Sequence, residues 1–127
     1  MSFFYISDAT DEGSERAGED AVVLAAGGEL DFEASPQLRE RIADQLNAGK
    51  RRVVLDLSAV TFIDSTAIGA LVGAAMRMRE HDEGSMAVAC SDDNRRVLRI
   101  FDIAGVESMV ALYPSREEAL SALATAA

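Results

Sequence analysis

The chain contains a single cysteine, Cys90, among its 127 residues. One cysteine cannot form an internal disulfide, and it leaves no cysteine cluster to hold a metal ion. No uninterrupted apolar run approaches the length of a membrane span, and the first residues lack the basic segment and long apolar core of a signal peptide. These absences predict a protein of the reducing cytoplasm, with no membrane partner.

Basic residues are scarce. The chain has 12 Lys and Arg against 22 Asp and Glu, which gives a net charge of -10. Such a surface repels phosphate backbones and anionic lipids, so direct binding of nucleic acid or of a membrane is not expected. The acids crowd the first twenty residues, where we predict a solvated acidic loop at 7–20 between the first two strands. An acidic interaction segment is the alternative interpretation.

Sequence motifs for nucleotide and metal binding are also missing. The chain has no G-x-x-x-x-G-K-[ST] loop, and no G-x-G-x-x-G follows an expected strand. Asp31, Asp56 and Asp64 would form a metal site only if the fold brought them together, and their spacing does not require it. We therefore predict no cofactor and no metal. Asp56 lies within an apolar strand, where a carboxylate needs partners, and we expect it to accept hydrogen bonds from loop amides.

What the chain does contain is a regular alternation of strands and helices, over a length typical of one domain, 1–127. Strands are expected at 3–6, 21–26 (continuing to 31 past a bulge or bend), 53–57, 86–90 and 109–112. The expected helices begin at capping residues: Ser35, Asp64 or Ser65, Asp92 or Asp93, and Ser115. Parallel neighbours need a crossover between them, so this order predicts an α/β domain. Its sheet is expected to be mixed, with a largely parallel core and about four flanking helices.

The stretch from Val53 to Met78 is the centre of this pattern. A near-continuous apolar run at 53–57 predicts a strand buried on both faces, and helical spacing takes over from Ala67. A short loop is expected between them, with Asp64 and Ser65 at the helix start. Short side-chain oxygens at such positions accept hydrogen bonds from free amides, so a plain capping role for Ser65 remains open.

A serine at a strand-to-helix turn also suggests the nucleophile of a hydrolase. The glycines of G-x-S-x-G are absent around Ser65, however. The one histidine, His81, lies about sixteen residues further on, roughly 24 Å away along a helix, so it cannot act as the base. The sequence therefore argues against a hydrolase with Ser65 as its nucleophile.

Three segments resemble a known family. Residues 56–71, DLSAVTFIDSTAIGAL, strongly resemble the STAS domains of bacterial anti-sigma factor antagonists. The sequence GELD at 28–31 matches a second landmark of that family, and 97–120 is similar to its last third. The resemblance extends from about Ala21 to Leu123. One departure is Ala67, where many relatives have glycine.

The resemblance implies a partner-switching protein, a kinase substrate and binding module rather than an enzyme. In this family the unphosphorylated antagonist binds an anti-sigma factor that is also an ATP-dependent serine kinase, and so frees a sigma factor. Phosphorylation of the serine that corresponds to Ser65 ends the binding, and a serine phosphatase resets the switch; Thr66 is the second-choice acceptor. The resemblance places partner contacts at Asp31, Asp64, Ser65, Thr66 and Ala67. The alternative is a STAS module without switching, which serves as a structural or ligand-sensing subunit of a larger complex.

Overall fold

A five-stranded sheet with the strand order β1-β2-β3-β4-β5 forms the middle of the molecule. The computed structural model describes residues 3–9, 20–81 and 84–125. The strands are β1 (Phe4–Asp8), β2 (Ala21–Leu30), β3 (Arg52–Ile63), β4 (Ser85–Ala89) and β5 (Ala111–Tyr113). β1 is antiparallel to β2, and the other three pairings are parallel. The mixed sheet with a largely parallel core is therefore confirmed.

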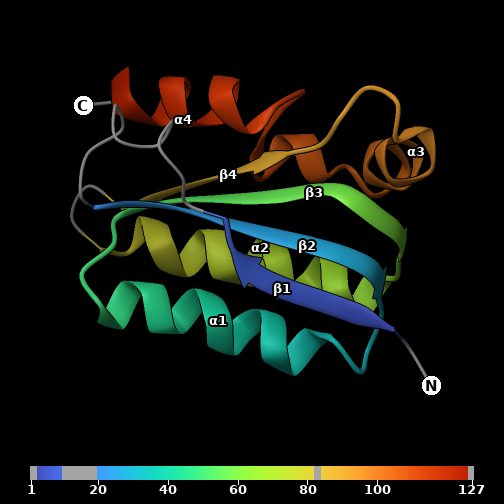
Figure 1. Ribbon diagram of the computed structural model, residues 1–127, viewed down its shortest axis with the longest axis horizontal. Coiled ribbons are helices and arrows are strands. Elements are labelled where there is room, and N and C mark those ends of the chain that lie inside the picture. The colour runs from blue at the N-terminus through green and yellow to red at the C-terminus, as the bar shows by residue number, and fades with distance from the viewer. Residues whose placement is uncertain (1–2, 10–19, 82–83, 126–127) are drawn as a thin grey trace.

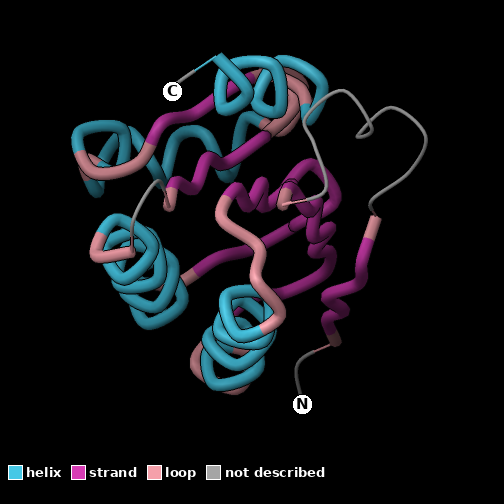
Figure 2. The backbone as a smooth tube through the Cα atoms, turned by 90° about the vertical axis from the view of Figure 1, so that its left-hand side faces the viewer, coloured by secondary structure: helices cyan, strands magenta, loops and turns pink. Residues whose placement is uncertain are grey.

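Helices cover both faces of this sheet (Figure 1). They are α1 (Ser35–Asn47), α2 (Ser65–Arg79), α3 (Arg95–Ala104) and α4 (Arg116–Thr125), with a short 3-10 helix at Val106–Ser108. α1 and α2 lie side by side on one face, and α4 lies on the other. Figure 2 shows the same layers from the side of the molecule. None of the helices in the described residues is long and apolar enough to cross a membrane.

The apolar core lies on both sides of the sheet, which explains why β3 begins as a continuous apolar run. Alternate residues of β3 contact opposite layers: Val53 and Leu55 pack on the α1–α2 side, and Val54 packs against α4. Burying one such side chain stabilises the fold by roughly 1.5–3 kcal/mol. The helices bury these apolar side chains: Leu38, Ile42 and Leu46 in α1, Leu71, Ala75 and Met78 in α2, Val97 and Phe101 in α3, and Ala119, Leu120 and Leu123 in α4.

β3 is longer than its sequence suggests, and the short loop expected before Asp64 is wrong. The strand runs on to Ile63 because β2 continues beside it, through register shifts near Gly27 and Gly28, until Leu30 pairs with Ile63. β4 ends at Ala89, so the second half of β3 has a strand neighbour on one side alone. Exposed polar residues there interrupt the apolar run and disguise the strand.

A single glycine explains how β1 and β2 approach each other at the end of the sheet. Gly28 has a φ of +80°, and a Cβ atom at this position would lie 2.2 Å from the carbonyl oxygen of Phe3. The next amide, that of Glu29, donates a hydrogen bond of 2.9 Å to the same oxygen. Only glycine tolerates both the conformation and the contact.

The helix caps predicted for α1 and α3 are wrong, and the one predicted for α4 is confirmed. Ser35 is the first residue of α1 rather than its cap, and its hydroxyl donates a hydrogen bond to the carbonyl oxygen of Asp31. Asn94, and neither Asp92 nor Asp93, caps α3 by accepting from the amide of Val97 at 3.3 Å. The residue immediately before the helix has the right geometry, so the aspartates come one or two residues too early. The Ser115 hydroxyl accepts from the amide of Glu118 at 3.1 Å, as predicted.

The acidic loop predicted at 7–20 begins later than expected. Ser7 and Asp8 belong to β1, where they pair with Ala25 and Leu24. The part of the prediction that concerns 10–19 lies outside the described residues.

Candidate functional site

Two aspartates follow the ends of neighbouring parallel strands. Leu30 ends β2 and Ile63 ends β3, and the two residues are paired in register. Asp31 and Asp64 therefore leave the sheet together, and the amide of Asp64 donates a hydrogen bond of 3.1 Å to the carbonyl oxygen of Leu30. The carboxyl ends of parallel strands are where α/β proteins commonly bind their ligands. This edge of the sheet is the candidate site.

Asp64 connects the two loops of the site. Its Oδ1 atom accepts from the amide of Ala67 at 2.9 Å, which makes Asp64 the N-cap of α2. Its Oδ2 atom accepts from the amide of Phe32, in the loop between β2 and α1, at 3.0 Å. One carboxylate thus closes the end of α2 and also holds the neighbouring loop.

Asp31 organises the loop itself. Its Oδ1 atom accepts from the amide of Glu33 at 3.0 Å, and its carbonyl oxygen accepts from the amides of Ala34 and Ser35. These bonds turn the chain from β2 into α1. Asp31 remains partly exposed, so its position beside Asp64 is compatible with the predicted partner contact.

Ser65 is the first residue of α2 and is exposed. Because Asp64 provides the cap, the hydroxyl of Ser65 is not needed for that role. It forms no hydrogen bond with any residue that the structure describes. The capping interpretation of Ser65 is therefore wrong: its hydroxyl stands at the surface, at the amino end of a helix of 15 residues.

The other two predicted contact residues differ. Thr66 is exposed on the first turn of α2 and accessible to a partner. Ala67 is fully buried, with 0% of its surface exposed, and its amide is bonded to Asp64. The partner contact at Ala67 stays a prediction; in this structure its methyl group belongs to the core beneath the helix start.

Two exposed phenylalanines near this site were not predicted from the sequence. Phe32, whose amide is bonded to Asp64, is 65% exposed, and Phe62, two residues before Asp64, is 41% exposed. Aromatic side chains are enriched at protein interfaces, so both are compatible with a partner surface at this edge. Their signal in the sequence is position: each lies within two residues of an aspartate of the site.

The remaining candidate groups lie elsewhere. Asp56 is buried in β3 and pairs with Arg116 of α4, whose Nε and Nη2 atoms both lie 2.9 Å from its Oδ2 atom. Its Oδ1 atom accepts from the amide of Ser58 at 3.0 Å, so the expected amide bond exists, whereas the arginine partner was not anticipated. His81 is exposed beyond the far end of α2. Within 3–9, 20–81 and 84–125, no three His, Cys, Asp or Glu side chains are grouped to hold a metal ion.

Cys90 is a buried thiol at 1% exposure. Burial raises its pKa from the ordinary value of 9.0 to about 11, and the negative charges of Asp56 and Asp92 contribute to the shift. A protonated, inaccessible thiol is a poor nucleophile, so Cys90 is part of the core rather than of a site.

Comparisons with known proteins show the family of this chain. The family model described as STAS domain matches residues 14–119. The chain is 31% identical to an anti-sigma-B factor antagonist of Staphylococcus aureus over 87 residues. These residues make up 68% of this chain and 78% of that protein.

Solved structures share the fold. An anti-sigma factor antagonist from Mycobacterium paratuberculosis superposes with a TM-score of 0.77 at 23% identity, over 95% of this chain and 94% of that one. The Bacillus cell fate determinant SpoIIAA in its phosphorylated form superposes with a TM-score of 0.61 at 22% identity, over 95% of this chain and 99% of that one.

Proposed function

This chain belongs to the STAS domain family, and from that membership we propose that it is an anti-sigma factor antagonist, switched by phosphorylation of Ser65. The proposal draws support from relatives named anti-sigma-B factor antagonist. In its unphosphorylated form the protein binds an anti-sigma factor, and the sigma factor that this partner held is released. The protein acts in the cytoplasm as a substrate and binding module, without catalysis of its own.

The observation that supports the proposal most strongly is that Asp64, and not Ser65, caps α2. The cap of α2 is made by Asp64, and the neighbouring hydroxyl is exposed and without a bond to the described residues. A kinase can therefore take up this hydroxyl without breaking the helix start. In the transfer, the Ser65 oxygen forms a bond to the γ-phosphorus of ATP, ADP leaves, and the hydroxyl proton passes to a base of the kinase.

The same arrangement explains how a phosphate would end the binding. Phosphorylation adds nearly two negative charges at pH 7. The amide groups at the start of α2 tolerate an anion in the free protein, so the fold need not change. In a docked interface the new charge would lie beside Asp64 and near Asp31 with no water around it, and like charges repel strongly under those conditions. A serine phosphatase restores the binding form.

Phosphate mapping tests the proposal directly. The protein is incubated with ATP and, one at a time, with each purified anti-sigma factor of the kinase type encoded in the same genome. Mass spectrometry then locates the phosphate. We expect it on Ser65, with Ser65→Ala unmodified and Thr66→Ala modified as the wild type is. Binding to an anti-sigma factor with no phosphate on Ser65 under any of these conditions would favour a STAS module without switching.

A further inference from the structure

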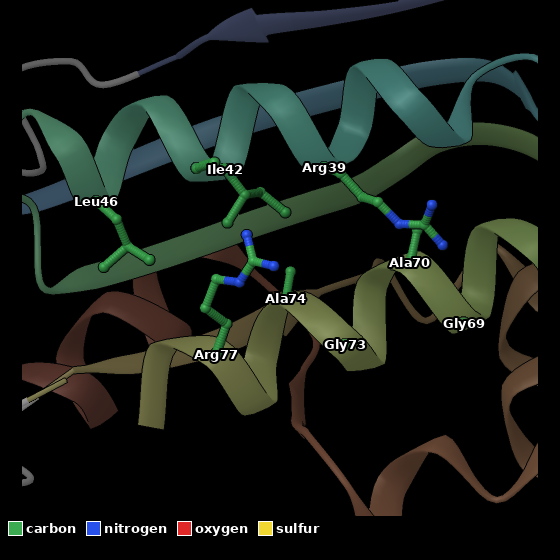
Figure 3. Close-up of a pocket in the computed structure, with 9 residues that line it drawn as sticks. Arg39, Ile42, Leu46, Gly69, Ala70, Gly73, Ala74 and Arg77 are labelled. Atoms are coloured by element: carbon green, nitrogen blue, oxygen red, sulfur yellow. The ribbon is translucent and has the colours of Figure 1, made fainter. Parts of the chain in front are cut away.

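A groove of about 160 Å³ lies between α1 and α2, next to the candidate site (Figure 3). Its floor is apolar, with Ile42 and Leu46 from α1 and Ala70 from α2. Arg39 of α1 extends toward α2 near Ala70, and Arg77 of α2 extends toward α1. The groove is thus an apolar strip with one cation from each wall.

Both arginines are exposed cations in an acidic chain with a net charge of -10. Neither guanidinium group forms a hydrogen bond or ion pair with a residue that the structure describes. A cation in the last turn of a helix complements the helix dipole, which accounts in part for Arg77. Arg39 is outside the last turn of α1, so the helix dipole does not account for it. The charge of the groove is therefore complementary to an anionic partner.

Glycines form the α2 wall of the groove. Gly69 and Gly73 are exposed and lie one helical turn apart, and a Cβ atom at either position would meet nothing within 4 Å. Glycine weakens a helix interior relative to alanine, and no contact inside the described part of the domain requires it here. What glycine provides at this surface is room for a second backbone to come close.

The size of the groove distinguishes between classes of ligand. Cavities that bury a small molecule usually measure about 300–1,000 Å³, and this groove, at about 160 Å³, is smaller. It suits one or two apolar side chains of a protein segment, as in the recognition of an amphipathic helix by a groove.

The groove is continuous with the predicted phosphorylation site. Ser65, Gly69, Gly73 and Arg77 follow one another at intervals of four residues, and all four are exposed. Residues at this spacing form one ridge along a helix. A partner that covers Ser65 can therefore also contact the groove along the same ridge.

We propose that the anti-sigma factor extends along this ridge from Ser65, inserts an apolar side chain between α1 and α2, and places acidic side chains against Arg39 and Arg77. The inference rests on the proposed function, because it names the chemistry of the same partner. In this proposal the groove anchors the complex, and the contact at Ser65 is the one that phosphorylation switches.

Isothermal titration against the anti-sigma factor tests the groove. Arg39→Glu and Arg77→Glu are each expected to weaken binding at least tenfold. Arg99→Glu, an exposed arginine of α3 that lines no part of the groove, makes the same change in charge and should stay within twofold of the wild type. The double variant Gly69→Ala, Gly73→Ala should bind more weakly although its thermal midpoint rises, so misfolding cannot explain its loss.

The outcomes separate the two proposals. If Ser65→Asp loses binding while the arginine and glycine variants bind as the wild type does, the groove proposal is overturned and the switch stands. If the wild type binds no anti-sigma factor, both fail. Sedimentation of the free protein as a dimer that Arg77→Glu dissociates would instead assign the groove to a second copy of this chain.

Discussion

The backbone amide of Phe32 donates a hydrogen bond of 3.0 Å to the Oδ2 atom of Asp64, although the two residues are 32 positions apart in the sequence. The other carboxylate oxygen caps α2 through the amide of Ala67. The loop that starts α1 and the residue that starts α2 are thus held by one side chain. Any partner that binds at this edge of the sheet contacts the loop before α1 and the start of α2, which Asp64 connects.

Removal of the Asp64 carboxylate should destabilise the fold. Asp64→Ala loses both a helix cap and the bond to the Phe32 amide, so we expect the free energy of unfolding to fall by about 2–3 kcal/mol. Asp64→Asn keeps an oxygen for the cap but presents an NH2 group to the Phe32 amide, and should lose only about 1 kcal/mol. Urea unfolding with unchanged m-values measures both. Equal losses for the two variants would contradict the bridging role.

Changes at Ser65 should separate binding from stability. The hydroxyl has no bond to the described residues, so Ser65→Ala should change the free energy of unfolding by less than about 0.5 kcal/mol. Ser65→Asp places an acid in the first helical turn and should be at least as stable as the wild type. Calorimetric titration against the anti-sigma factor should nevertheless show a loss of at least tenfold for Ser65→Asp alone. Equal affinities for wild type and Ser65→Asp would rule out the charge mechanism.

Gly28→Ala should damage the fold more than an ordinary glycine substitution. A residue with a side chain loses about 1–2 kcal/mol at a positive φ, and the contact with the Phe3 carbonyl oxygen adds to that loss, so we expect about 3 kcal/mol or more. Gly49 is the matched control, because it has a φ of +91° and a Cβ atom added there would meet nothing within 4 Å. Gly49→Ala should lose only about 1–2 kcal/mol in the same denaturation experiment.

The buried pair of Asp56 and Arg116 should show strong coupling. The Asp56 side chain is 10% exposed and that of Arg116 is 30% exposed, so the carboxylate depends on this partner more than the guanidinium does. We expect Arg116→Ala to lower the free energy of unfolding by about 2–3 kcal/mol, because it leaves a buried charge with the Ser58 amide as its other partner. A double-mutant cycle with Asp56→Ala should give a coupling energy of about 1 kcal/mol or more. A coupling energy near zero would show that the Asp56 carboxylate does not depend on Arg116.

The raised pKa of Cys90 predicts a loss of stability at high pH. Its pKa is about 11 in the folded protein, against an ordinary value of 9.0. Between these values the unfolded chain releases the thiol proton while the folded protein keeps it, so the free energy of unfolding falls as the pH rises from about 9 to about 11. The difference in this slope between wild type and Cys90→Ala isolates the thiol from other titrating groups. Identical slopes would show that the thiol is not shifted.

Local patterns were sufficient for most of the fold. The helical spacing of apolar residues that begins at Ala67 corresponds to α2, because a helix that packs on a sheet must present one apolar face. The expected continuation of β2 past Gly27 and Gly28 is confirmed as well. The pattern failed in the second half of β3, where pairing with β2 stabilises a strand that has little apolar periodicity of its own. It also failed at the caps of α1 and α3, since a cap depends on the residue at which the helix begins.

The sequence by itself determined the class of the protein: alternating strands and helices, an acidic surface, and a motif around Ser65 similar to that of a known family. Tertiary structure decided which side chain does what. Asp64 became the cap and the connection to Phe32, which freed the hydroxyl of Ser65, and the packing of α1 on α2 brought Arg39 and Arg77 to one groove. Such roles depend on contacts between residues far apart in the chain, and spacing along one segment contains no information about them.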